Sequence, residues 1–484
     1  MTKSSLKKNF AYNLINRVSG MLFPLVTFPY ASRILEADGI GEINFLNSII
    51  SWIMLIFSIG IPVYGVREVA RNRDDKNDLI IRSTELWWLQ LSFSLLGYLV
   101  VLFAIMFSTR IYENRELFLI LSTSIFFNAL GCEWFYSGVE DFKYITIRSI
   151  VTRILYIILL YLLVKSRSDL VIYAWLTVLV NVGSNIFNFY RFNNLIKPFN
   201  IKFKDIKPFK HIIHTLKIFS MSISINLYST LNIVILGFLS TSFAVGYFVG
   251  ATRITTIAVG VIAAIQTTLL PRASYLIASN KYVEYERMLN KILNLTYILV
   301  PPIVFGLIVM SPIIIPIFCG DTYKPAVVTL MIIAPSLFFS VISGTLNVTV
   351  MIPFKMENKS TIACIIAGIV SILINFLLIP SLAQNGASIG LVAAEFTVFF
   401  ILYYYSQKNL NIKIFQISYI KYIIGAFIMY GFCLLIKAQI VNDWIALGVV
   451  PLCGFMIYLS FLFLTKDRLT LDTFNVLKTK ISLR

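Results

Sequence analysis

One arginine lies deep inside an apolar stretch, where a charged side chain needs a physical reason to be present. Arg253 is about nine residues into the stretch 244–270, which corresponds to roughly 12 Å of helix. An arginine at that depth costs on the order of 2.5–3.5 kcal/mol on insertion scales. A guanidinium offers several donors to phosphate oxygens. The position of Arg253 therefore predicts that its side chain contacts an anionic group of a ligand. A structural pair with a neighbouring carbonyl or acid is the competing interpretation.

Two other embedded charges leave alternatives open. Arg17 lies one to two turns inside the stretch 11–30, so it could contact a ligand or extend to the lipid headgroups. Glu395 lies about as deep in the stretch 387–406 as Arg253 does in its own. It could be a hydrogen-bonded structural group, a coupling site for H⁺ or Na⁺, or the partner of Arg253 in an ion pair.

Two further charges, Glu133 and Arg153, lie near the expected cytosolic ends of their stretches. For both, an interfacial salt bridge is a better interpretation than a functional role.

Uncharged polar residues gather on two stretches, 11–30 and 216–238. In the first they recur at steps of three and four, which places them on one helix face. This face consists of Asn9, just before the stretch, and of Asn13, Asn16, Arg17, Gly20, Pro24 and Thr27. In the second they are Ser220, Ser222, Ser224, Asn226, Tyr228, Ser229, Thr230 and Asn232. Helices of this character line a wet cavity and do not face lipid.

Fourteen apolar stretches of membrane-spanning length must position these residues. The chain of 484 residues is 58% hydrophobic and 13% charged, which is too apolar for a soluble protein. The stretches are continuous and not alternating, so they predict helices and not barrel strands. We therefore expect an all-α membrane protein with about fourteen transmembrane helices.

The basic residues predict the orientation. With the N-terminus in the cytosol, 32 of the 41 Lys and Arg residues fall on the cytosolic side, as the positive-inside rule requires. Seven fall in loops on the other side: Arg33, Arg110, Arg115, Lys165, Arg167, Lys324 and Lys437. Both termini are therefore expected in the cytosol. The net charge of +18 then lies beside anionic headgroups, so no nucleic-acid partner is expected.

Several patterns typical of enzymes or metal proteins lack their required context. Gly386 to Gly390 matches GxSxG, but that motif needs a strand–turn–helix setting and a histidine base. His211 and His214 have no Cys or carboxylate nearby in the sequence, so no metal site is expected. The five cysteines show no CxxC spacing, and no P-loop occurs. We expect no cofactor and no catalytic residues.

Five segments carry a resemblance to a known family. They are Arg33–Gly41 followed by Phe45, Gly60–Ala70, Ile235–Gly237 with Val245–Tyr247 and Ala251–Ile254, Gly320–Ala326, and Gly386 through Glu395. In this order, and with fourteen spans, they resemble the Wzx-type polysaccharide (O-antigen repeat-unit) flippases of the multidrug/oligosaccharidyl-lipid/polysaccharide exporter superfamily. The chain departs from the family at Asn232, where members often carry an aspartate.

The resemblance implies two pseudo-repeated six-helix lobes that rock about a central cavity, with two helices appended at the C-terminus. The implied division is an N-terminal lobe at 1–192, a basic cytosolic linker at 193–215, a C-terminal lobe at 216–406, and helices 13 and 14 with a cytosolic tail at 407–484. The two polar stretches and the spans that follow them would line the cavity, which places Arg17 and Arg253 inside it.

The implied substrate is an undecaprenyl-diphosphate-linked oligosaccharide, moved from the cytosolic to the outer leaflet by alternating access in lipopolysaccharide or other polysaccharide biosynthesis. Arg17 and Arg253 would neutralise the diphosphate, and Glu395 would couple transport to H⁺ or Na⁺. The residues expected to bind sugar hydroxyls are Asn13, Asn16, Asn226, Tyr228 and Asn232. No bond is made or broken, so the chain is expected to be a transporter and not an enzyme.

The expected location is the inner (cytoplasmic) membrane. The expected partners there are membrane lipids, a polysaccharide polymerase and chain-length machinery. A cation-coupled multidrug exporter of the same superfamily and a peptidoglycan-precursor flippase are alternatives within transport. A polymerase-type membrane enzyme is the alternative from another class. It usually needs a large external loop, and the external loops expected here are about ten residues or shorter.

Overall fold

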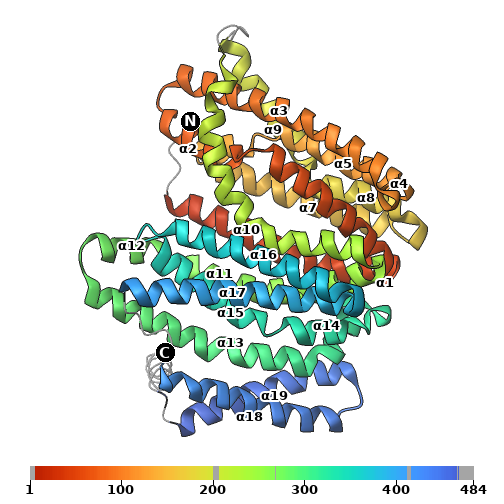
Figure 1. Ribbon diagram of the computed structural model, residues 1–484, viewed down its shortest axis with the longest axis vertical. Coiled ribbons are helices and arrows are strands. Elements are labelled where there is room, and N and C mark those ends of the chain that lie inside the picture. The colour runs from red at the N-terminus through yellow and green to blue at the C-terminus, as the bar shows by residue number, and fades with distance from the viewer. Residues whose placement is uncertain (1–5, 200–205, 268, 411–415, 466, 468–484) are drawn as a thin grey trace. The chain divides into compact units, whose positions relative to one another are not determined.

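The computed structural model describes residues 6–199, 206–267, 269–410, 416–465 and 467, and the regular elements within these ranges are all helical (Figure 1). Twelve helical segments among them are long and apolar enough to cross a membrane. The prediction of an all-α membrane protein with many spans is confirmed, and the count of fourteen stays a prediction.

Two features explain why twelve segments are found. Leu6–Phe57 (α1) runs for 52 residues, about 78 Å at 1.5 Å per residue, which is more than twice the hydrocarbon thickness. Its backbone leaves helical geometry at Glu36, with φ 58° and ψ −176°, so two span-length helices meet there. Ile212–Leu239 (α10) is 28 residues long, but the side chains of 220–229 lie outside the described residues.

Packing divides the chain into two compact units. The first comprises Met1–Val249 with Asn375–Ala387, and the second comprises Gly250–Ile374 with Ser388–Arg484. The division into repeated lobes at 192 and 216 stays a prediction.

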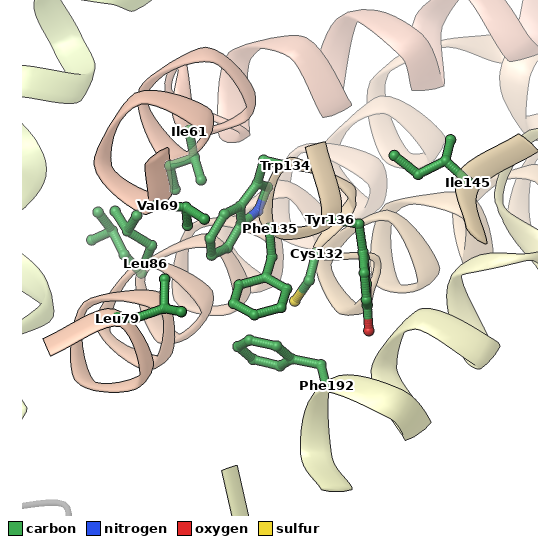
Figure 2. Packing of buried hydrophobic residues seen from close by; sticks show 11 residues of the cluster. Ile61, Val69, Leu79, Leu86, Cys132, Trp134, Phe135, Tyr136, Ile145 and Phe192 are labelled. Atoms are coloured by element: carbon green, nitrogen blue, oxygen red, sulfur yellow. The ribbon is translucent and has the colours of Figure 1, made fainter. Parts of the chain in front are cut away.

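Within the first unit α1 packs against α10 and against three further helices. These are α3 (Lys76–Phe107), α5 (Arg115–Leu130) and α7 (Phe142–Leu163). The unit also contains α2 (Ile61–Asn72), α4 (Thr109–Glu113), α6 (Glu133–Gly138), α8 (Leu170–Val178) and α9 (Asn185–Ile196). A cluster of buried apolar side chains from α2, α3, α6, α7 and α9 fixes one end of this unit (Figure 2). Burying each large side chain contributes roughly 1.5–3 kcal/mol.

Within the second unit α13 (Tyr282–Cys319) is the central helix. It packs against α14 (Ala326–Ile333), α15 (Ser336–Leu346), α18 (Ile420–Gln439) and α19 (Asp443–Leu464) (Figure 1). Other helices are α11 (Ser242–Thr267), α12 (Leu270–Ala278), α16 (Glu357–Leu382) and α17 (Gln384–Leu410). The helices α11, α16 and α17 each contribute residues to both units.

A buried carboxylate fastens the start of α10 to α3. Glu85 Oε2 lies 2.6 Å from Lys210 Nζ and 3.0 Å from His211 Nε2, and Glu85 Oε1 accepts from the Lys207 backbone N–H at 2.8 Å. His211 Nδ1 lies 3.0 Å from the Tyr64 hydroxyl. Burial lowers the pKa of His211, which favours a neutral ring that donates to Glu85 and accepts from Tyr64.

We expect Glu85→Ala to lower the melting temperature of the detergent-solubilised protein. The substitution removes an acceptor from three donors, of which His211 is buried with it, and the cost is on the order of 3 kcal/mol. Glu284→Ala is the matched control. Its pair with Lys281 is 3.6 Å long and half exposed, so less than about 1 kcal/mol is expected. Equal melting temperatures for the two variants would contradict a stabilising role for Glu85.

Candidate substrate-binding residues

Two arginines of α7 are held by protein partners. Arg148 forms a salt bridge to Glu133 at 2.7 Å, which confirms the salt bridge predicted for Glu133, while its position at the membrane interface stays a prediction. Arg153 Nη1 instead donates to the backbone oxygen of Asn16 at 3.1 Å and to the Asn16 side chain at 3.2 Å, with a further bond to Ser19. The salt bridge predicted for Arg153 is therefore wrong, because its guanidinium bonds to α1 and forms no salt bridge with a described acid.

The polar face of α1 has two kinds of residue. Arg17 is exposed, and its only described contact is the bond from Nε to Asn13 Oδ1 at 3.3 Å. Asn16 is partly buried and engaged by Arg153. Arg17 and Asn13 are therefore available to a ligand, whereas Asn16 also has a structural role.

Arg253 lies in α11, eleven residues after its start at Ser242, or about 16 Å along the axis. Its side chain is exposed. Within the described ranges it has no hydrogen bond, ion pair or aromatic contact. The proposed pair with Glu395 is absent, although both residues are described and belong to the second unit. The guanidinium is thus a cation in an apolar span, and no described residue accepts a hydrogen bond from it.

Glu395 is partly buried in α17. Ser340 of α15 hydrogen-bonds to its carboxyl group, and the Cys364 thiol of α16 lies close by. No cationic side chain in the described residues pairs with Glu395. The carboxyl group has a neutral hydroxyl partner, which suits both the structural and the ion-coupling interpretations.

Asn232 joins two distant helices. It is 1% exposed in α10, and its Oδ1 accepts a hydrogen bond of 2.6 Å from Nδ2 of the equally buried Asn375 in α16. This contact makes Asn232 a helix-packing residue in this conformation. The side chains of Asn226 and Tyr228, two further predicted binding residues, lie outside the described residues.

Sequence reasoning missed a junction between α1 and the turn from α10 to α11. Arg110 of α4 donates to the backbone oxygens of Gly237 and Ser240 and, at 3.0 Å, to the Ser242 hydroxyl. That hydroxyl in turn bonds to Glu42. Arg110 also lies 4.8 Å from the ring centre of Phe45. The sequence places Arg110 only in an external loop, because its hydrogen-bond partners are more than a hundred residues away.

Two glycines allow this junction to close. A Cβ on Gly41 would overlap the backbone oxygen of Ser242, and one on Gly246 would overlap the backbone oxygen of Ala37. The backbones of α1 and α11 are therefore in direct contact, as small residues permit between membrane helices. The junction lies at the end of the spans that carries few Lys and Arg, the expected external side.

Relatives and solved structures are consistent with the predicted family. The chain is 25% identical over 413 residues to a protein of Escherichia coli (strain K12) named "Putative O-antigen transporter", covering 84% of this chain and 98% of that one. It is 26% identical over 237 residues to a "Probable low-salt glycan biosynthesis flippase Agl15" of Haloferax volcanii, which covers 48% of this chain and 49% of that one.

The fold is shared with transporters of known structure. The lipid II flippase MurJ in an inward closed conformation matches with a TM-score of 0.72 at 18% identity, over 95% of this chain and 99% of that one. An inward-facing multidrug resistance MATE family transporter matches with a TM-score of 0.63 at 14% identity, over 83% of this chain and 98% of that one. Residues 6–277 match the model of the family described as "Polysaccharide biosynthesis protein". The chain belongs to this polysaccharide biosynthesis protein family.

Proposed function

We propose that the chain is a flippase that moves undecaprenyl-diphosphate-linked oligosaccharides from the cytosolic to the outer leaflet by alternating access. The observation that carries the proposal is Arg253, a cation inside an apolar span with no described protein partner. A group so costly to embed is retained where a ligand supplies its counter-charge. The family and the names of the relatives point to a glycan as the cargo.

In this mechanism the arginines and the amides act on different parts of the substrate. Arg253 and Arg17 donate to the diphosphate oxygens and offset the cost of taking that charge across hydrocarbon. Asn13 stays within reach of the same ligand, because it already contacts Arg17. The sugar hydroxyls are hydrogen-bonded by Asn16, Asn226, Tyr228 and Asn232. Asn16 and Asn232 can bind a sugar only after their present packing contacts have rearranged.

The function is tested in a strain that lacks the gene, with and without its restoration. We expect a lipid-linked glycan to accumulate in the deletion strain, detected by mass spectrometry of undecaprenyl lipids, while a surface polysaccharide disappears. The mass of the accumulated lipid identifies the cargo. Unchanged lipid-linked glycans would contradict the flippase and make cation-coupled drug export the leading alternative.

Glu395 is proposed as the coupling residue for H⁺ or Na⁺. In vesicles that contain the purified protein, we expect Glu395→Gln to remove the dependence of flipping on an imposed pH gradient, because an amide neither binds nor releases a proton. Ser340→Ala is the matched control, since it removes the hydroxyl partner but keeps the carboxyl group. If the Gln variant responds to the gradient as the native chain does, Glu395 is structural.

We also propose an inner-membrane location with both termini in the cytosol, and association with a polysaccharide polymerase and chain-length machinery. The asymmetry of Lys and Arg between the two sides supports this orientation.

A further inference from the structure

The first unit contains a cavity that the sequence did not indicate. Its volume is about 240 Å³, and its wall includes Ser51, Trp52, Ser58, Pro62, Asn128 and Thr230. These residues come from α1, the loop after it, α2, α5 and α10.

The chemistry of the wall favours a neutral ligand. None of the residues lining the described cavity is charged, so a diphosphate would find no counter-charge here. The wall instead combines an indole with hydroxyl and amide groups. A sugar ring has the matching chemistry, because it presents an apolar C–H face and a rim of hydroxyl groups.

Two polar side chains of the wall have unused hydrogen-bonding groups within the part of the chain that the structure describes. The Asn128 amide and the Ser51 hydroxyl make no hydrogen bond to any residue that the structure describes. Each can therefore donate to or accept from a ligand. The Ser58 hydroxyl donates to the backbone oxygen of Leu55 at 3.0 Å and keeps its lone pairs as acceptors.

The Trp52 indole N–H lacks a hydrogen-bond acceptor among the described residues. Its Nε1 is buried. By contrast, the indole of Trp134 donates to Gln90 at 2.9 Å. A buried donor without an acceptor costs about 1–3 kcal/mol, and such a group in a native structure calls for an explanation. A small rotation of the indole toward the cavity would give this donor a ligand oxygen.

We propose that this cavity binds one neutral sugar ring of the transported glycan, with the Trp52 indole against its C–H face and the Asn128 amide and Ser51 hydroxyl on its hydroxyl groups. The inference rests on the proposed function and adds to it a sugar subsite that is separate from the arginines. The site would make affinity depend on the glycan and not only on the diphosphate lipid.

The test compares two lipids on the purified full-length protein. One is the lipid-linked glycan isolated from the deletion strain, and the other is undecaprenyl diphosphate without sugars. We expect the native chain to bind the glycan-bearing lipid more tightly. Trp52→Phe and Asn128→Ala should each weaken that binding by about tenfold, the equivalent of 1.4 kcal/mol, and leave undecaprenyl diphosphate binding unchanged. Trp444→Phe is the control, because Trp444 is 67% exposed at the start of α19.

The outcomes separate the subsite from the function on which it rests. If both variants keep native affinity for the glycan-bearing lipid, the cavity holds water only and the proposal is overturned. If a variant loses both lipids equally, its residue supports the fold and not a sugar site, which also overturns the proposal. If the native chain binds neither lipid, or no lipid-linked glycan accumulates, the proposed function fails and the subsite fails with it.

Discussion

Replacing Gly246 by valine is expected to abolish transport while the protein still inserts into the membrane. Any side chain at this position meets the backbone oxygen of Ala37, and neither backbone can move without separating α1 from α11. The same holds for Gly41, where a Cβ would also lie 2.8 Å from the backbone nitrogen of Gly246. Repacking of a flexible side chain cannot relieve such an overlap, because the atoms that a new Cβ would meet belong to the backbone.

The reason for a large effect is that alternating access needs both of its end states. In the structure the junction of α1 with α11 is closed, with Arg110 bonded to the turn between α10 and α11. A variant unable to close it would remain open at the expected external side. Because each transport cycle must return through the closed state, the expected result is loss of flipping and not a modest decrease.

The measurement combines glycan transport with labelling from outside. A cysteine at Ser240, beside the junction, should react faster with a membrane-impermeant maleimide in Gly246→Val than in the native background. Gly306→Val is the matched control, because no atom lies within 4 Å of a Cβ added at Gly306. Normal transport by an abundant Gly246→Val protein would show that the contact is not required for the cycle.

The sequence predicted the spans well because hydrocarbon thickness sets their length. The expected stretch 387–406, for example, corresponds to the helical segment Gln384–Lys408. It predicted less about where helices break or extend. Glu36 takes a left-handed φ of 58° inside what is otherwise one continuous helix, and no glycine or proline at that position indicates it.

Partner choice among the embedded charges could not be predicted, because it depends on how each helix is rotated. Glu133, Arg148 and Arg153 lie within one short part of the sequence, yet the acid pairs with Arg148 and Arg153 bonds to Asn16. Glu85 and His211 are 126 residues apart, so nothing in the local pattern indicated their contact. By contrast, the exceptional position of Arg253 was visible in the sequence, because the cost of a charge in hydrocarbon does not depend on the fold.

Replacing Arg253 by alanine is the second substitution for which a large effect is expected. A guanidinium that bonds an anionic group contributes about 1.5–3 kcal/mol, so transport should fall by roughly ten- to a hundredfold. Stability should change little, since the exposed side chain leaves no described partner without its bond. The readout is accumulation of the lipid-linked glycan in cells that contain a normal amount of the variant.

Two matched variants make the result specific. Arg272→Ala removes the same charge from α12, where the side chain is also exposed but outside the candidate spans, and should transport normally. Arg253→Lys keeps a point charge but loses the planar fork that matches phosphate oxygens, so it should recover part of the activity. If Arg253→Ala and Arg272→Ala transport equally well, a charge at position 253 is dispensable. The diphosphate must then be neutralised by other groups, of which Arg17 is the next to test.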